Sequence, residues 1–124
     1  MATSGSAHAD LKTSPDIECE LTPEMGILLG SRGIKVLEKV LRYLDGVVQS
    51  HGWPQPTVTL RLETDMEIPD WKGIIILFSF AVPEAVAEAY LGILYPDIDV
   101  FAKSLTPAQR DLFDRLIWFD VTTA

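Results

Sequence analysis

Residues 57–82 read TVTLRLETDMEIPDWKGIIILFSFAV, two apolar runs joined by a polar connection. In the first run Val58, Leu60 and Leu62 alternate with polar residues, a period of two that is typical of a strand with one buried face. In the second run, residues 73–82, both alternating sets are apolar, which predicts a strand covered on both faces. The stretch therefore predicts a β-hairpin whose second strand lies in the middle of a sheet.

The two faces of this second strand differ in size, and the difference predicts which of them packs against helices. The heavier face carries Ile74, Ile76, Phe78, Phe80 and Val82. The lighter face carries Ile75, Leu77, Ser79 and Ala81. Because the largest side chains bury the most apolar surface, we expect the face of Phe78 to form the core.

The whole chain has 124 residues, of which 48% are hydrophobic, and this predicts one domain with a core of its own. A net charge of −8 opposes binding to nucleic acid, whose phosphates require cations. A single cysteine, Cys19, excludes an internal disulfide and a cysteine-rich zinc site. Residues 1–12 lack the apolar core of a secretory signal, so we expect a cytoplasmic protein without membrane contact. We expect a flexible tail at residues 1–14 and a single α+β domain at residues 15–124.

A short strand and a long helix are predicted before the hairpin. In residues 16–21 apolar side chains alternate with acidic ones, which predicts the strand. Thr22 and Pro23 are a typical N-cap and first helical residue, and we expect the helix to run to about Ser50. Its apolar stripe consists of Ile27, Gly30, Ile34, Leu37, Leu41, Leu44 and Val48. Its opposite side is basic and carries Arg32, Lys35, Lys39 and Arg42.

Three glycines lie within this helix, in residues 26–33, GILLGSRG. A phosphate-binding loop of the G-x-x-x-x-G-K-[ST] type would need a lysine and a hydroxyl that this stretch lacks at the required positions. Two structural explanations are favoured over phosphate binding. The helix restarts with Ser31 as an N-cap, or the glycines allow close packing of the helix against the sheet.

Two further helices and a strand are predicted after the hairpin. Pro83 and Glu84 open the first helix. Its predicted buried face consists of Val86, Ala89, Tyr90, Ile93 and Leu94. Residues 95–99, which include Pro96, predict its end. Thr106 and Pro107 begin a short helix to about Arg115, and residues 116–121 alternate as a last strand.

The predicted element order is strand, helix, strand, strand, helix and strand. This order is that of a ferredoxin-like βαββαβ sandwich, an α+β fold with an antiparallel sheet and helices on one face. In that topology the first and third strands are central, and the third strand here is the most apolar of the four. If residues 16–21 do not form a strand, the alternative is a three-stranded sheet with helices on one side.

Titratable side chains that could carry chemistry are few and scattered. His8 lies in the expected tail, and His51 lies at the end of the long helix, where the helix dipole favours an imidazole. Asp65, Glu67 and Asp70 lie close together in the hairpin connection and could hold a calcium or magnesium ion, although the EF-hand spacing is missing. A solvated acidic turn is the favoured interpretation, and cation binding stays open. We therefore predict no catalytic residue, no cofactor and no metal site.

The hairpin connection also carries a resemblance. Residues 65–72, DMEIPDWK, followed by the apolar run, resemble a turn of small uncharacterised prokaryotic proteins with a D-x-E-I-P-D-W hairpin turn. The resemblance covers the hairpin and the helix that follows it. It implies no function.

The favoured function is that of a small interaction or assembly protein that forms a homodimer. A ferredoxin-like sheet is covered on one face only, so its other face would expose Ile75, Leu77 and Trp118, the candidate interface. A small enzyme or ligand-binding domain that uses a pocket on the sheet face is one alternative. Another is an acidic decoy for a basic protein surface, because residues 57–124 contain 11 acidic and 5 basic residues.

Overall fold

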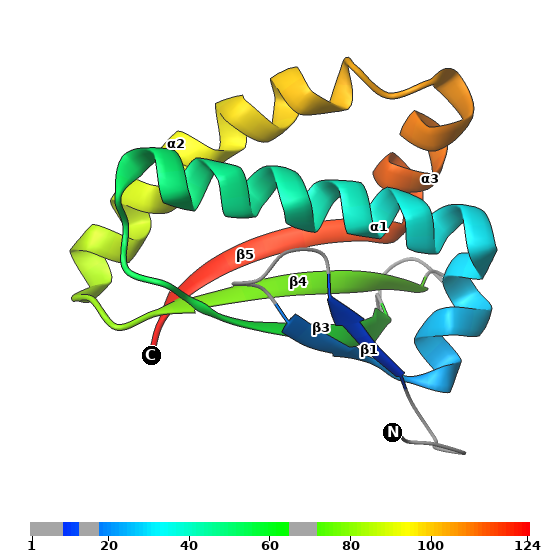
Figure 1. Ribbon diagram of the computed structural model, residues 1–124, viewed down its shortest axis with the longest axis horizontal. Helices are drawn as coiled ribbons and strands as arrows, with labels where there is room; N and C mark the ends of the chain where they lie inside the picture. Colours follow the sequence, from blue (N-terminus) through cyan, green and yellow to red (C-terminus); the bar gives the residue numbers. More distant parts are fainter. Residues whose placement is uncertain (1–8, 13–17, 65–71) are drawn as a thin grey trace.

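The computed structural model describes the chain at residues 9–12, 18–64 and 72–124 (Figure 1). Two short strands, β1 (Ala9–Lys12) and β2 (Glu18–Leu21), precede helix α1 (Pro23–His51). The predicted hairpin strands are β3 (Thr57–Thr64) and β4 (Lys72–Phe80). Helices α2 (Glu84–Ala102) and α3 (Pro107–Leu116) lead to the last strand, β5 (Ile117–Thr123).

The main sheet has three strands in the order β3-β4-β5, so the apolar strand β4 is central, as its two apolar faces predict. Strands β3 and β4 are antiparallel, with Val58 opposite Phe78. Strands β4 and β5 are parallel, with Ile74 beside Ile117. The three helices lie on the same side of this sheet (Figure 1). The molecule is therefore a two-layer α+β structure.

The ferredoxin-like prediction is wrong in its sheet. That fold would insert the first predicted strand between β4 and β5, and its sheet would be antiparallel. Instead β5 pairs directly with β4 in parallel, and β2 pairs with β1 in a separate two-stranded sheet. A parallel pair requires a long crossover, which α2 and α3 supply. Strand β1 lies within the predicted tail, so residues 9–12 of that tail have a regular structure after all.

The core lies between the helices and the Phe78 face of the sheet, as predicted. Four residues of β4 are completely buried there: Ile74, Ile76, Phe78 and Phe80. Helix α1 contributes the completely buried Val36, Leu37, Leu41, Leu44 and Val48. Alternation along the strand and three- to four-residue spacing along the helix therefore identify the same apolar layer from both sides.

Helix α1 begins and ends where the sequence predicts. The Oγ1 atom of Thr22 accepts a hydrogen bond from the backbone N–H of Met25 at 3.3 Å, and Pro23 occupies the first turn. Gly52 ends the helix in the left-handed region with φ of 66°. Between these ends, Gly30 has φ of 68° and ψ of 177°, which breaks the helix into two segments. The predicted apolar stripe is not buried along its whole length, because Ile27, which lies before this break, is 84% exposed.

The glycines near the break have structural roles. Gly30 adopts a backbone conformation that is essentially restricted to glycine. At Gly33 the Cβ of any larger residue would lie 2.9 Å from the Cβ of Leu29. Only glycine fits at this position, because the helical segments before and after the break pack closely here. These two roles account for Gly30 and Gly33 without a phosphate ligand, whereas Gly26 has open space where a Cβ would lie.

Helix α2 corrects another prediction, because it continues through Pro96 to Ala102 instead of ending near Tyr95. Contacts to α1 hold its second half in place. The hydroxyl of Tyr43 donates a hydrogen bond to the carbonyl oxygen of Asp97 at 3.0 Å, and the Tyr43 ring stacks on Phe101 with centroids 4.7 Å apart. Burial, together with the nearby Asp97 carboxylate, raises the pKa of Tyr43 above its ordinary value.

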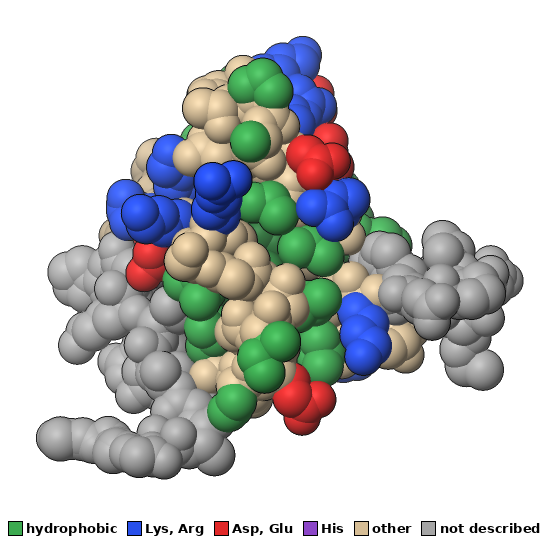
Figure 2. Space-filling model, turned by 90° about the vertical axis from the view of Figure 1, so that its right-hand side faces the viewer, with side chains coloured by type: hydrophobic (Ala, Val, Ile, Leu, Met, Phe, Trp, Pro, Cys, Tyr) green, Lys and Arg blue, Asp and Glu red, His purple; other side chains and the backbone are tan. Residues whose placement is uncertain are grey.

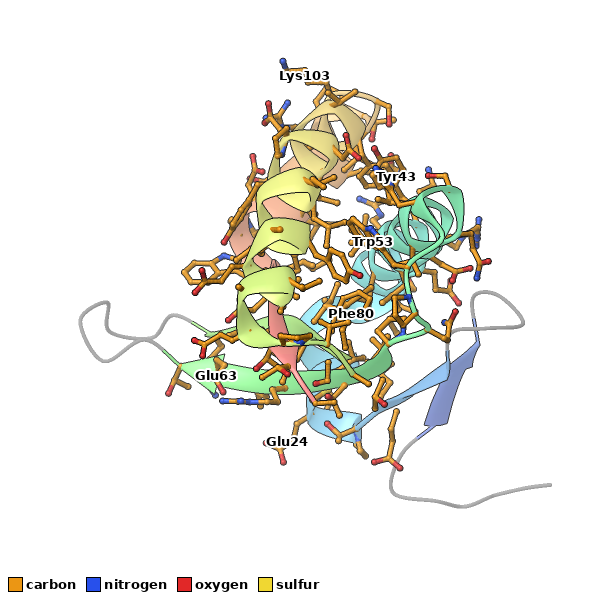
Figure 3. All side chains as sticks on the ribbon, turned by 90° about the vertical axis from the view of Figure 1, so that its left-hand side faces the viewer. Glu24, Tyr43, Trp53, Glu63, Phe80 and Lys103 are labelled. Carbon is orange, nitrogen blue, oxygen red and sulfur yellow. The ribbon has the colours of Figure 1, made fainter. Side chains whose placement is uncertain are left out.

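An aromatic cluster closes the opposite end of the space between α1 and α2. The ring of Trp53 stacks on Tyr90 with centroids 4.0 Å apart and meets Phe80 edge-on at 6.0 Å. Figure 3 shows Tyr43 and Trp53 on the α1 side of this space, with Phe80 below Trp53. Aromatic pairs of this geometry stabilise the fold beyond the area that they bury. They fix the orientation of α2, and so determine which of its faces meets solvent.

Asp45 on α1 is the one buried charged residue in the described part of the chain, and its Oδ1 atom has no hydrogen-bond partner there. A buried oxygen without a partner is destabilising by about 1–3 kcal/mol. We therefore expect Asp45→Ala to increase the free energy of unfolding by about 1–2 kcal/mol in urea titrations. The exposed Lys39→Ala on the same helix is the control and should change it by less than about 0.5 kcal/mol. A loss of stability in Asp45→Ala would instead show that this carboxylate has a partner.

Candidate interaction surface

The structure brings the three predicted interface residues together on the face of the sheet opposite the helices, here called the open face. Strand register places Ile75 between Arg61 of β3 and Trp118 of β5. Leu77 is the next residue of β4 on this side. Ile75 and Leu77 are half-buried, and Trp118 is 50% exposed. The three residues therefore form one continuous apolar strip across β4 and β5.

Polar residues surround this strip. Leu77 lies between Thr59 and Asp120, and Ser79 lies between Thr57 and Thr122. On β3 the guanidinium of Arg61 forms an ion pair with Glu63 at 3.0 Å. An apolar centre with a polar rim is the usual composition of a protein–protein interface.

A hollow of about 330 Å³ lies at the edge of the sheet, between α2, α3 and β5. Its lining residues are Tyr95, Ile98, Phe113, Asp114, Ile117, Trp118 and Phe119. Asp114 is the only acidic or basic residue among them, and it already pairs with Arg110 at 3.6 Å. The hollow is on the helix side of β5, so it differs in position from the sheet-face pocket that the sequence suggests. Trp118 borders both the hollow and the open face.

A smaller hollow of about 220 Å³ lies where α1 begins. It is lined by Glu24, Ile27, Leu28, Leu62 and Lys72. Figure 2 views the end of the molecule that contains the start of α1 and shows hydrophobic side chains reaching the surface between charged ones. The exposure of Ile27 follows from the break at Gly30, which turns the first segment of α1 away from the buried stripe.

The structure places His51 at the exposed end of α1, as predicted. Its Nδ1 atom lies 3.0 Å from the carbonyl oxygen of Val47, and its ring stacks on Trp53. Within residues 9–12, 18–64 and 72–124 no three His, Cys, Asp or Glu residues are grouped as metal ligands. His8 and the acidic turn Asp65, Glu67 and Asp70 lie outside the described residues.

Sequence reasoning missed an exposed apolar surface on α2. Val86, Ala89 and Ile93 were predicted to be buried, but all three are exposed, and Val100 is 65% exposed. The buried residues of the helix are Ala87, Leu94, Ile98 and Ala102. Because apolar residues occupy most of the circumference of α2, their spacing does not determine which side faces the core. This broad apolar composition was the available signal of a second surface.

Comparison with protein-family models, with curated proteins and with solved structures finds no match to this chain. No helix in the part of the chain that the structure describes is long and apolar enough to span a membrane.

Proposed function

We propose that this protein is an interaction protein whose copies pair through the open face, around Ile75, Leu77 and Trp118. One observation carries the proposal. Strand β4 has large apolar side chains on both faces, whereas the three helices cover only one of them. A central strand of this composition is typical of a sheet that is covered on both sides.

Pairing of two copies is the simplest way to cover the strip. Removing apolar surface from water contributes about 25 cal/mol per Å², so burying two such strips contributes several kcal/mol before the cost of association. The same patch on both copies can meet across a twofold axis, because such an interface is self-complementary. The net charge of −8 makes two copies repel each other, and an apolar strip keeps charges out of the contact.

Leu77→Lys should halve the mass of the assembly measured by light scattering at tens of micromolar protein. The substitution places a charge in an apolar contact on both sides of the twofold axis, and a buried unpaired charge is strongly unfavourable. The variant should keep the circular dichroism spectrum of the parent, because Leu77 lies on the side of β4 away from the core.

The matched control is Thr57→Lys, which adds the same charge at an exposed position on the rim of the open face. Its mass should equal that of the parent. Equal masses for the parent and Leu77→Lys would contradict pairing through this face.

Ligand binding is a second candidate function, and the hollow beside β5 favours it. Its volume of about 330 Å³ and its aromatic lining suit a small apolar molecule. A small apolar ligand that raises the melting temperature of the parent, but not that of Phe113→Ala, would support this alternative. The acidic-decoy hypothesis is less favoured, because Arg32, Lys35, Lys39 and Arg42 are all exposed and give the surface a mixed charge.

A further inference from the structure

The hollow beside β5 is built from buried aliphatic side chains and from aromatic rings. Ile98 of α2 and Ile117 of β5 are nearly completely buried where they line it. Tyr95, Phe113 and Phe119 come from α2, α3 and β5, so each of the three surrounding elements supplies one ring. Phe113 and Phe119 are half-buried, and Tyr95 is 54% exposed. A ligand in the hollow therefore meets rings that are only partly covered by the protein.

The rings of Tyr95 and Phe119 lie at an angle to each other. Their centroids are 5.0 Å apart and their planes are inclined by 49°. In the stacked pair of Trp53 and Tyr90 the planes differ by only 16°, so that each ring covers the other. Tilted rings leave part of each face free for a third group. Because the face of an aromatic ring is electron-rich, it attracts a cation within about 6 Å of the centroid.

The charge at the hollow also favours a cation. Among the described residues that line it, Asp114 is the only acidic or basic one. Its 3.6 Å pair with Arg110 is longer than a hydrogen bond, and both side chains are substantially exposed. The pair of Arg115 and Asp111 has the same spacing on α3 but is hydrogen-bonded at 3.0 Å. A long, exposed ion pair is weak, so the Asp114 carboxylate can act as the counter-charge of a bound cation.

The apolar lining distinguishes between kinds of cation. A primary ammonium group carries three N–H donors and is strongly hydrated. The Asp114 carboxylate and the Tyr95 hydroxyl are the only polar side-chain groups among the lining residues that the structure describes, so a buried primary ammonium would leave donors poorly satisfied. A quaternary ammonium group has no N–H donor, and its methyl groups pack against apolar carbon atoms. The volume of about 330 Å³ is at the small end of the usual range for ligand pockets, which suits a small head group.

We propose that the hollow beside β5 binds a quaternary ammonium group. The rings of Tyr95, Phe113 and Phe119 surround its methyl groups, and Asp114 is its counter-charge. This inference rests on the second candidate function, ligand binding in this hollow, and names the class of ligand. The net charge of −8 adds a long-range attraction for cations.

Nuclear magnetic resonance titration of the full chain tests the preference for a cation. The probes are choline and 3,3-dimethyl-1-butanol, a neutral molecule of the same shape in which carbon replaces the nitrogen. Choline should shift the aromatic signals of Tyr95 and Phe119 and bind at least about tenfold more tightly than the neutral probe. Equal affinities would overturn the quaternary ammonium proposal and retain ligand binding. No binding of either probe at tens of millimolar would overturn both and leave pairing through the open face unaffected.

A second titration distinguishes two sources of the same head group. A free amine and a trimethyllysine side chain of another protein share this chemistry. A trimethyllysine peptide that binds more tightly than choline, and more tightly than the same peptide with unmodified lysine, supports the site and identifies a protein as its source. Choline that binds at least as tightly as the peptide supports the site for a free small molecule.

Substitution of Asp114 tests the counter-charge. Asp114→Asn keeps the shape of the side chain and should weaken choline binding about fivefold, with no change for 3,3-dimethyl-1-butanol. Asp111→Asn is the matched control, because it removes the same charge from α3 at a residue that does not line the hollow. Its affinity for choline should equal that of the parent. Equal losses in the two variants, or no loss in Asp114→Asn, would overturn the role of Asp114.

Discussion

Phe78→Ala is expected to reduce the free energy of unfolding by about 3–5 kcal/mol, the usual loss for a buried aromatic residue. Phe78 is completely buried at the centre of β4, and its ring lies 6.3 Å from that of Phe80. The substitution removes apolar contact and leaves a cavity between the sheet and α1, where close packing limits collapse. Urea unfolding followed by circular dichroism measures the effect.

Phe119→Ala is the matched control for this prediction. Phe119 lies on the same face of the sheet but on the edge strand β5, and it is only half-buried. Because less apolar surface is lost, we expect roughly half the effect of Phe78→Ala. A loss at Phe78 no larger than that at Phe119 would show that the centre of the core has been misplaced.

Gly30→Val is expected to reduce the free energy of unfolding by about 1–3 kcal/mol or more. Open space is not the obstacle, because no atom would lie within 4 Å of a Cβ at position 30. The obstacle is the backbone, which has φ of 68° and ψ of 177° at this residue. A β-branched side chain adopts this conformation only at a high energetic cost.

Two other glycines of α1 provide controls for Gly30→Val. Gly26 and Gly46 lie within the helix, have no positive φ and have open space where a Cβ would lie. Alanine at either position should therefore stabilise the protein by about 0.5–1 kcal/mol. If Gly30→Val behaves like these two substitutions in the same urea titration, the helix does not break at Gly30.

Local signals in the sequence predicted several elements correctly. The alternation of Val58 and Leu60 and the all-apolar β4 predicted the hairpin and its central strand. Thr22 predicted the start of α1, and Gly52 predicted its end. Thr106 also caps α3 as expected, and the structure shows the full capping box with Gln109. Each of these signals acts over a few residues, so it does not depend on the rest of the fold.

The wrong predictions concern features that tertiary packing determines and local sequence does not. Nothing local to β5 specifies whether it pairs with β4 or with an intervening strand, because its alternation fits either neighbour. Pro96 is a local signal to end a helix, yet the contacts of Tyr43 with Asp97 and Phe101 retain the helical path beyond it. The outward orientation of Ile93 follows from the same packing of α2 against α1.

The candidate interface was predictable to the extent that strand alternation determines it. Alternation alone placed Ile75 and Leu77 opposite Phe78. The position of Trp118 beside Ile75 depends on the parallel register of β5, which differs from the antiparallel pairing that was expected. Trp118 nevertheless lies on the predicted face, because neighbouring residues in register point to the same side of a sheet whether strands are parallel or antiparallel.

The most direct test of pairing through the open face is an isotope-filtered nuclear Overhauser experiment on a mixture of labelled and unlabelled protein. In such a sample only contacts between different copies give signals. Pairing predicts signals from the methyl groups of Ile75 and Leu77 to the second copy, including the indole protons of its Trp118. A protein that forms an assembly but gives no such signals at Ile75 and Leu77, or gives them only at Val86, Ile93 and Val100, would contradict it.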